Sequence, residues 1–361
     1  MSYLSFNKAS IRAVTPTDPY HRKAREICLS WLDGAAHFSL HTSGSTGLPK
    51  EIVVKRAQLQ ASVRASADAL SLQPHSRVLA CININYVGGF MMLIRAMELD
   101  WEVVLVPPVS NPLLDLPATL SFDFAALVPM QLAEIISNER TRDLPQKLGK
   151  ILLGGVGLTP AQYDAFQKLG PEIYLGYGMT ETVSHVALRS LSDAHDAPYR
   201  LTGDLEIGTD ARGCLYLRGA VTDFELVQTN DLAMVSADRK SFRILGRIDN
   251  TVNSGGIKMQ LETLDYQFGA VFREAGISNR FFFWKMPDPR LGEALVLVVE
   301  GENTLQKQIR ALVEEHLERN KRPRKICFTE LFLMTGSDKV DKSRTFDTLS
   351  GPAAADNISV S

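Results

Sequence analysis

Cysteine is scarce in this chain of 361 residues, which contains only Cys28, Cys81, Cys214 and Cys327. The four do not form a Cys-x-x-Cys pair, and no histidine stands near them at the spacing of a zinc ligand. The scarcity argues against a disulfide framework and against a cysteine-rich metal site. It favours reduced thiols in a cytosolic enzyme.

A long uncharged apolar run is also missing. Arg95, Glu98 and Asp100 interrupt the best candidate, so no stretch reaches the roughly 20 apolar residues that a membrane-spanning helix needs. The first residues lack the basic-then-apolar order of a signal peptide. We therefore expect a soluble, cytoplasmic protein with no membrane insertion.

An excess of charge of either sign is absent as well. The chain has 39 basic and 41 acidic residues, for a formal net charge of −2, and so has no overall attraction to nucleic acid or to an acidic membrane surface. The basic run at 319–325 is interpreted as the cationic end of a helix rather than as a site for nucleic acid or a CoA phosphate. No nucleic-acid partner is expected, and a homo-oligomer stays open.

Apolar patterning predicts the fold class. At 45% hydrophobic residues, the chain can bury a full core and is long enough for two domains. Short continuous apolar runs alternate with helical patterns, which predicts an α/β fold with a parallel sheet covered on both faces. These runs lie at 78–82, 103–106, 125–128 and 151–153. Shorter strands are expected afterwards at 214–217, 224–227 and 242–245.

The pattern changes again near residue 249. Beyond it, helices are expected at 261–275 and 305–317 and strands at 281–284 and 294–299, which together make a small α+β domain. We expect an N-terminal domain at 1–248, a C-terminal domain at 249–349 and a small, polar tail at 350–361.

The most informative segment that the chain does contain is the loop 41–50, His-Thr-Ser-Gly-Ser-Thr-Gly-Leu-Pro-Lys. Its glycines let several backbone N–H groups converge on one anion, and its hydroxyls and lysine add donors and charge. It is not a Walker A loop, because no Gly-Lys-Ser/Thr triplet opens a following helix. By composition alone it is more typical of a flexible turn. The candidate ligands of a polyphosphate are Thr42, Ser43, Gly44, Ser45, Thr46, Gly47 and Lys50.

Four further segments follow in order, at 174–182, 229–232, 246–262 and 335–342. Together with the loop they resemble the adenylate-forming superfamily of AMP-dependent synthetases and ligases, which includes acyl-CoA synthetases, luciferases and peptide-synthetase adenylation domains. The resemblance covers residues 41 to 344. It implies a large N-terminal domain of layered sheets and helices, here shortened at its N-terminus, and a small mobile C-terminal domain. It also implies ATP, Mg²⁺ and CoA as cosubstrate.

Thr180 and Glu181 come directly after a predicted strand, where open α/β sheets commonly place their ligands. A hydroxyl there can donate to the α-phosphate of ATP, and a carboxylate can hold Mg²⁺, which prefers oxygen ligands. The resemblance assigns these roles to Thr180 and Glu181. A helix-capping Thr-Glu pair is the alternative.

The resemblance places the ribose hydroxyls at Asp231, with help from Arg247, and includes Tyr177 and Gly178 in the ATP site. Asp231 could instead be a turn residue, the commoner place of an Asn-Asp pair. Gly154-Gly155 would let adenine approach the backbone closely, although a simple tight turn explains that pair equally well.

By the same resemblance, Lys339 is the adenylation lysine of the C-terminal domain. Its ammonium group could reach both the carboxylate and the α-phosphate and offset the charge that grows in the transition state. Asp338 stands where glycine is common in the family, so Lys342 stays an alternative, and a solvated loop lysine is the other.

The step with CoA is assigned to the segment before residue 262. The resemblance makes Asp249 the hinge of a domain rotation, and bare glycine backbone would let a pantetheine arm pass. The expected residues of the CoA channel are Gly255, Gly256 and Lys258.

The substrate is indicated by chain length and by one segment. The phosphate loop begins near residue 42, and compact chains of this kind resemble the o-succinylbenzoate–CoA ligases of menaquinone biosynthesis. Their substrate-side segment resembles 85–92 with Arg95. The expected pocket contains Tyr86, Gly89 and His185, although His185 could also be a surface or core histidine.

The implied reaction has two steps. ATP and 2-succinylbenzoate give an acyl-adenylate and pyrophosphate, and the CoA thiol then displaces AMP to give the thioester. Two alternatives stay open: another aryl- or acyl-CoA ligase, and a non-catalytic nucleotide- or acyl-binding protein.

Overall fold

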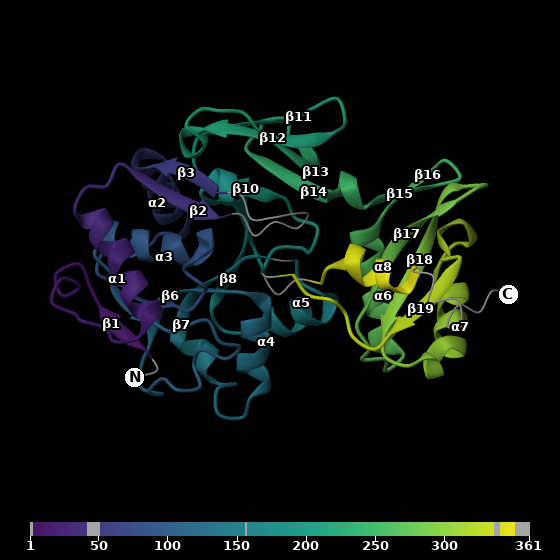
Figure 1. Cartoon of the computed structure of the whole chain (residues 1–361), viewed down its shortest axis with the longest axis horizontal. Helices are drawn as coiled ribbons and strands as arrows, with labels where there is room; N and C mark the ends of the chain where they lie inside the picture. Colours follow the sequence, from purple (N-terminus) through teal and green to yellow (C-terminus); the bar gives the residue numbers. More distant parts are fainter. Residues whose placement is uncertain (1–2, 42–50, 156, 336–339, 351–361) are drawn as a thin grey trace.

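The computed structural model describes residues 3–41, 51–155, 157–335 and 340–350. Most of its described strands form one twelve-stranded sheet (Figure 1), in the order β1-β5-β4-β6-β7-β8-β9-β10-β14-β13-β12-β11. The neighbours from β5 to β8 are parallel, and the remaining pairs are antiparallel. In chain order the strands are β1 (Leu4–Phe6), β4 (Arg77–Ala80), β5 (Glu102–Leu105), β6 (Phe122–Leu127), β7 (Leu148–Leu153), β8 (Glu172–Met179), β9 (Ser184–Ser190), β10 (Tyr199–Leu201), β11 (Leu205–Thr209), β12 (Cys214–Gly219), β13 (Val227–Val235) and β14 (Ser241–Arg247).

Helices cover both faces of the parallel part. Alternate strand residues enter different cores: Val78 packs with α1, α2 and α3, whereas the neighbouring Leu79 packs with α4 and α5. This alternation follows from the period of two in a strand, and it confirms the predicted α/β fold with a doubly covered parallel sheet. The helices are α1 (Pro19–Leu32), α2 (Arg56–Leu70), α3 (Val87–Glu98), α4 (Pro129–Ser137) and α5 (Pro160–Phe166).

Local signals explain where two of these helices begin. Asp18 accepts hydrogen bonds from the N–H groups of Tyr20 and His21, and Pro19 occupies the first turn of α1. Thr159 caps α5 in the same way, with Pro160 next. The helix α3 differs, because nine of its twelve residues are buried, as expected for a helix that is apolar all round.

A separate two-stranded sheet joins β2 (His37–His41) and β3 (Glu51–Lys55). The helix α2 starts at the residue that follows β3. The predicted phosphate loop connects the two strands, but Thr42 to Lys50 lie outside the described residues.

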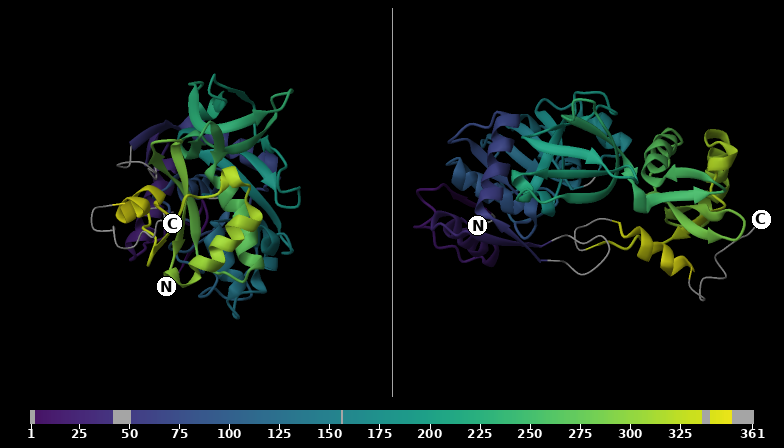
Figure 2. Two further views of the ribbon diagram at one scale, coloured as in Figure 1. Left: turned by 90° about the vertical axis from the view of Figure 1, so that its right-hand side faces the viewer. Right: turned by 90° about the horizontal axis from the view of Figure 1, so that it is seen from above.

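The C-terminal part has its own sheet and cores (Figure 1). Its strands are β15 (Thr251–Ser254), β16 (Ile257–Gln260), β17 (Phe281–Asp288), β18 (Gly292–Glu300) and β19 (Lys325–Thr329), and its helices are α6 (Leu261–Glu274), α7 (Gln306–His316) and α8 (Lys342–Ser350). Figure 2 shows this part beside the large sheet along the long axis of the molecule. The two parts touch where α5 meets α6, through an ion pair of 2.7 Å between Asp164 and Arg273.

Short 3-10 helices complete the chain: η1 (Leu144–Lys147), η2 (Thr180–Thr182), η3 (Ala220–Thr222), η4 (Ile248–Asn250), η5 (Asn303–Leu305) and η6 (Arg319–Lys321). The strand expected at 224–227 is wrong, since β13 begins only at Val227. Asp223 and Phe224 have φ angles of +54° and +62°, which no strand residue adopts. Among the described residues, no helix combines the length and apolar character required to cross a membrane.

Candidate functional site

Four of the predicted nucleotide residues lie at the carboxyl ends of β7 and β8. Gly154 and Gly155 follow β7, Tyr177 and Gly178 lie near the end of β8, and η2 comes next. A side chain at Gly154 would meet nothing within 4 Å, so its backbone is open to a ligand. Gly155 has a φ angle of +94°, so a tight turn also explains why glycine stands there.

Thr180 and Glu181 lie in η2, between β8 and β9. The capping alternative does not apply, because Thr182 does the capping: its Oγ1 accepts from the Met179 N–H at 3.0 Å and contacts the Ser184 carbonyl at 2.9 Å. The hydroxyl of Thr180 and the exposed carboxylate of Glu181 have no hydrogen bond or ion pair to any described residue. Both groups are therefore available to a ligand.

The backbone after η2 is strained. Val183 and Ser184 have φ angles of +53° and +90°, which is unusual for any residue with a side chain and most of all for a β-branched one. Gly178 is required by the same turn, since a Cβ there would lie 2.1 Å from the Ser184 carbonyl oxygen. Strain of this kind persists only where the surrounding structure holds it.

Asp231 lies inside β13 and is therefore not a turn residue. Its carboxylate accepts a hydrogen bond of 2.6 Å from the Tyr177 hydroxyl and lies 3.4 Å from Nη1 of Arg247. Burial, together with the charge of Asp231, raises the pKa of Tyr177, so the phenol stays a donor. The structure thus brings Tyr177, Asp231 and Arg247 together beside the end of β8.

Arg247 also reaches the expected hinge. Its Nη2 donates to Asp249 at 2.9 Å, and the amide of Asn230 approaches the same carboxylate at 3.2 Å. Asp249 lies in η4, the connection between the last strand of the large sheet and β15. Asn230, a residue of β13, thereby holds the connection to the large sheet.

His185 is buried and contacts Ser66 through Nε2 at 3.1 Å. The Ser66 hydroxyl donates to the Ser62 carbonyl at 2.8 Å, so its single proton is used and the Nε2–H of His185 must be the donor. Burial, reinforced by the charge of Arg95, holds the pKa of His185 well below its usual value. His185 is therefore a neutral core histidine with an unpartnered Nδ1.

Arg95, which the sequence placed with the substrate-side segment although not among the three expected pocket residues, is the most unusual group here. It is 1% exposed, and its Nη2 contacts the hydroxyls of Ser66 at 3.2 Å and Ser184 at 3.4 Å. Its Nε has no partner, and no carboxylate of the described residues lies within ion-pair distance. Burial lowers the pKa of Arg95 to about 10, so the charge remains at neutral pH. An arginine within the apolar run 87–97 was the signal in the sequence.

The other two expected pocket residues, Tyr86 and Gly89, lie at the start of α3. Tyr86 is the residue before α3, and Gly89 lies in the first turn. A Cβ at Gly89 would lie 2.3 Å from the Ile82 carbonyl oxygen. Close packing of α3 on this backbone therefore explains why glycine stands at this position.

The expected CoA residues lie apart from η2, on the small sheet (Figure 1). Gly255 and Gly256 form the two-residue turn between β15 and β16, with φ angles of +60° and +85°. A two-residue hairpin turn of this kind needs positive φ at both positions, so turn geometry explains both glycines. Lys258 is exposed on β16. Lys339 lies outside the described residues.

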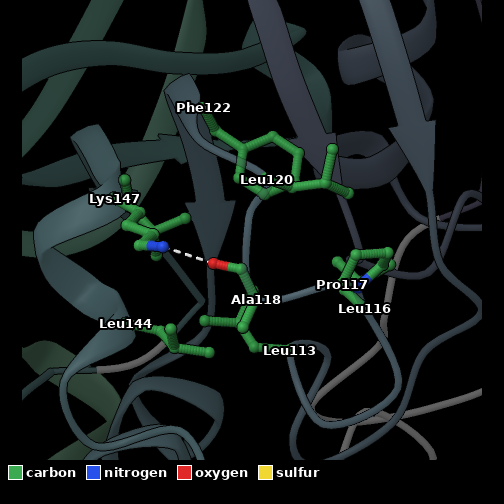
Figure 3. Close-up of a pocket in the computed structure, with 9 residues that line it drawn as sticks. Leu113, Leu116, Pro117, Ala118, Leu120, Phe122, Leu144 and Lys147 are labelled. Carbon is green, nitrogen blue, oxygen red and sulfur yellow. Dashed lines mark hydrogen bonds between the residues drawn. The ribbon is translucent and has the colours of Figure 1, made fainter.

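A small pocket elsewhere contains none of the predicted residues (Figure 3). Leucine side chains and Phe122 line it, and Lys147 donates to the Ala118 carbonyl oxygen across one side. It lies beside the amino ends of β6 and β7, the edge opposite to η2. Among the described residues, no cluster of three or more acidic, histidine or cysteine side chains could hold a metal ion alone.

Comparison with known proteins places the chain in a family. Residues 33–212 match the family described as AMP-binding enzyme. A solved structure of an acyl-CoA synthetase (AMP-forming)/AMP-acid ligase II-like protein from Dyadobacter fermentans is 43% identical, with a TM-score of 0.66 over 96% of this chain and 99% of its own. The chain therefore belongs to the AMP-binding enzyme family. This confirms the predicted superfamily and enzyme class.

Two more distant relatives are 2-succinylbenzoate–CoA ligases by name. The protein of Bacillus mycoides is 25% identical over 334 residues, which cover 83% of this chain and 68% of the relative. The o-succinylbenzoate CoA synthetase of Bacillus subtilis, solved with its acyl-adenylate intermediate, is 18% identical and has a TM-score of 0.70 over 85% of this chain and 68% of its own. The second likeness supports the fold.

Proposed function

We propose that this protein is an ATP-dependent acid–CoA ligase that activates 2-succinylbenzoate, an acid with two carboxylates. The observation that carries the choice of acid is Arg95, a buried guanidinium without a carboxylate partner among the described residues. A buried charge is costly unless an opposite charge or hydrogen bonds compensate it. A carboxylate of the acid that is not activated supplies such a partner, and a simple monocarboxylic acid does not.

The proposed first step joins the acid to AMP. Asp231 and Tyr177 hold the ribose, and the open backbone at Gly154-Gly155 faces adenine. Thr180 donates to the α-phosphate, and the loop Thr42 to Lys50 binds the outer phosphates. The acid carboxylate then attacks the α-phosphorus, a P–O bond to pyrophosphate breaks, and acyl-adenylate forms.

Glu181 fits the requirements of a magnesium ligand. Its carboxylate is exposed and has no other partner among the described residues, and Mg²⁺ is commonly held by one or two carboxylates plus substrate phosphates rather than by an all-protein cage. When bound, Mg²⁺ neutralises phosphate charge. In the second step the CoA thiol attacks the acyl carbon and AMP leaves, with Gly255, Gly256 and Lys258 along the path of CoA.

Pyrophosphate release tests this function. We expect release with 2-succinylbenzoate at a kcat/KM at least about a hundredfold above that with benzoate, fatty acids or neutral amino acids, because none of these has a second carboxylate to pair with Arg95. Arg95→Met is expected to remove most of that preference, whereas Arg64→Met, at an exposed position of α2, keeps it. Release with another acid alone points to a different ligase, and no release with any acid rules out catalysis.

The hinge gives a separate expectation. Proline fixes φ and hinders a backbone that must adopt two states, so Asp249→Pro is expected to leave one half-reaction largely intact and to impair the other. Adenylation is measured as pyrophosphate release, and thioester formation is measured from supplied acyl-adenylate and CoA. Equal losses in both, together with a lower melting temperature, would indicate misfolding instead of a hinge.

A further inference from the structure

Three buried polar side chains form a stripe along α2. Gln58, Ser62 and Ser66 are spaced four residues apart, so they lie on one face of the helix. Each is at most 8% exposed. Polar groups buried in this way must find partners, and the partners show what this face of α2 holds.

Side chains of this stripe donate hydrogen bonds to two turns that resemble each other. Ser62 Oγ donates to the Val183 carbonyl at 2.8 Å, directly after η2, and Gln58 Nε2 donates to the Val221 carbonyl in η3 at 3.0 Å. In η3, Thr222 repeats the bonds of Thr182: its Oγ1 accepts from the Gly219 N–H at 3.1 Å and donates to the Glu225 carbonyl at 2.7 Å.

Both turns end in residues with positive φ that are not glycine, Val183 and Ser184 in one and Asp223 and Phe224 in the other. Such conformations relax unless neighbours hold them. The bond from Ser62 reaches the carbonyl of the first strained residue after Thr180 and Glu181, so it fixes the direction in which this turn leaves η2.

Ser66 acts one helical turn further on. Its hydroxyl contacts Arg95 at 3.2 Å and His185 at 3.1 Å while it donates to the Ser62 carbonyl. One face of α2 therefore touches both sides of the candidate site: Ser62 the side of Thr180 and Glu181, and Ser66 the side of the unpaired guanidinium. At its start, α2 follows β3, whose preceding segment is the predicted phosphate loop.

We propose that Ser62 is a positioning residue for MgATP and that Ser66 is a positioning residue for the acid, both acting from α2. The proposal rests on the proposed function, because it assigns one residue to each of the two substrates. Neither serine touches the reacting atoms. Ser62 keeps Thr180 and Glu181 in place, and Ser66 keeps Arg95 aimed.

The test compares two substitutions that each remove one hydroxyl group, Ser62→Ala and Ser66→Ala. Ser62→Ala is expected to weaken the binding of MgATP. The KM of MgATP for pyrophosphate release should rise by about 10- to 100-fold, as is typical when a partner that orients a metal ligand is lost. The KM of the acid should stay unchanged. Ser66→Ala should do the opposite and raise the KM of the acid by about tenfold without changing that of MgATP.

The resemblance between the turns at η2 and η3 supplies the control for this test. Thr182→Val removes the capping hydroxyl of the turn that carries Thr180 and Glu181, and Thr222→Val removes its counterpart in η3, which holds no predicted site residue. We expect Thr182→Val to behave as Ser62→Ala does, and Thr222→Val to lower the melting temperature alone. Ser62→Thr keeps a hydroxyl and should restore most of the MgATP affinity.

Calorimetric binding of MgATP separates this proposal from the proposed function. A wild-type protein that binds MgATP but releases no pyrophosphate with any acid refutes the ligase, yet Ser62→Ala must still weaken that binding. If both serine variants raise both KM values in parallel, or if neither does, α2 has only a structural role and the proposal is wrong.

Discussion

Replacing Glu181 by glutamine is expected to slow pyrophosphate release by about a hundred- to a thousandfold, the loss typical when one preorganised group that stabilises developing charge is removed. The variant should also need more Mg²⁺ to reach half of its maximal rate. The reason is the state of this carboxylate. It is exposed, and it has no hydrogen bond or ion pair among the described residues. It also follows Thr180 in a turn whose shape is held from both sides, by Thr182 and by Ser62.

A magnesium titration of wild type and variant measures this effect. Glu172→Gln is the matched control, because Glu172 lies at the other end of the same strand, β8, and should leave both the rate and the magnesium dependence unchanged. Since glutamine keeps the size of the side chain, both variants should melt close to wild type. Equal rates for Glu181→Gln and wild type at every magnesium concentration would remove Glu181 from the site.

The parallel sheet could be predicted because its strands are continuous apolar runs. The expected strands at 78–82 and 151–153 correspond to β4 and β7. A strand that is buried on both faces needs no alternation of apolar and polar residues. The segment 224–227 also has three apolar residues, interrupted by Glu225, but it is mostly a turn. The hydroxyl of Thr222 and the side chain of Gln58 hold this turn, and neither interaction is visible in local sequence.

The glycines show a similar limit. The motifs assigned Gly89, Gly178 and the pair Gly255-Gly256 to ligand sites. The structure explains each by backbone geometry: close packing on Ile82 and Asn83, contact with Ser184, and a hairpin turn. A glycine that a ligand would require and a glycine that a turn requires look alike in sequence, so their assignment to ATP or CoA stays a prediction.

Arg95 could not be assigned from sequence for a different reason. An arginine in an apolar helix normally finds an acid from another element, and only the three-dimensional structure shows that the nearest groups here are the hydroxyls of Ser66 and Ser184. The tautomer of His185 likewise could not be predicted from sequence, because it follows from the hydrogen bond that the Ser66 hydroxyl donates to the Ser62 carbonyl. Unpartnered buried groups are informative because they are rare.

Lys339 and Lys342 are the two candidates for the adenylation lysine, and the structure describes the surroundings of Lys342 alone. Lys342, the first residue of α8, pairs with Asp265 of α6 at 2.5 Å, and its Nζ lies 5.6 Å from the ring centroid of Phe282 in β17. Asp265 also accepts from the Phe283 N–H at 2.6 Å. We therefore expect Lys342→Ala to destabilise the protein, by about 1–3 kcal/mol for the polar group left without its partner, and to leave the rate of adenylation per folded molecule unchanged.

Lys339, which lies outside the described residues, is expected to behave in the opposite way. Lys339→Ala should slow acyl-adenylate formation by about a hundred- to a thousandfold, equivalent to about 3–4 kcal/mol of transition-state stabilisation, because the ammonium group offsets charge that grows as the carboxylate attacks phosphorus. The variant should still convert supplied acyl-adenylate and CoA to thioester, since in that step the CoA thiol attacks the acyl carbon and no carboxylate attacks phosphorus. Single-turnover assays of each half-reaction, with melting curves of both lysine variants, measure the contrast. If Lys339→Ala adenylates normally and Lys342→Ala does not, the two roles are exchanged, and the ion pair with Asp265 must open during catalysis.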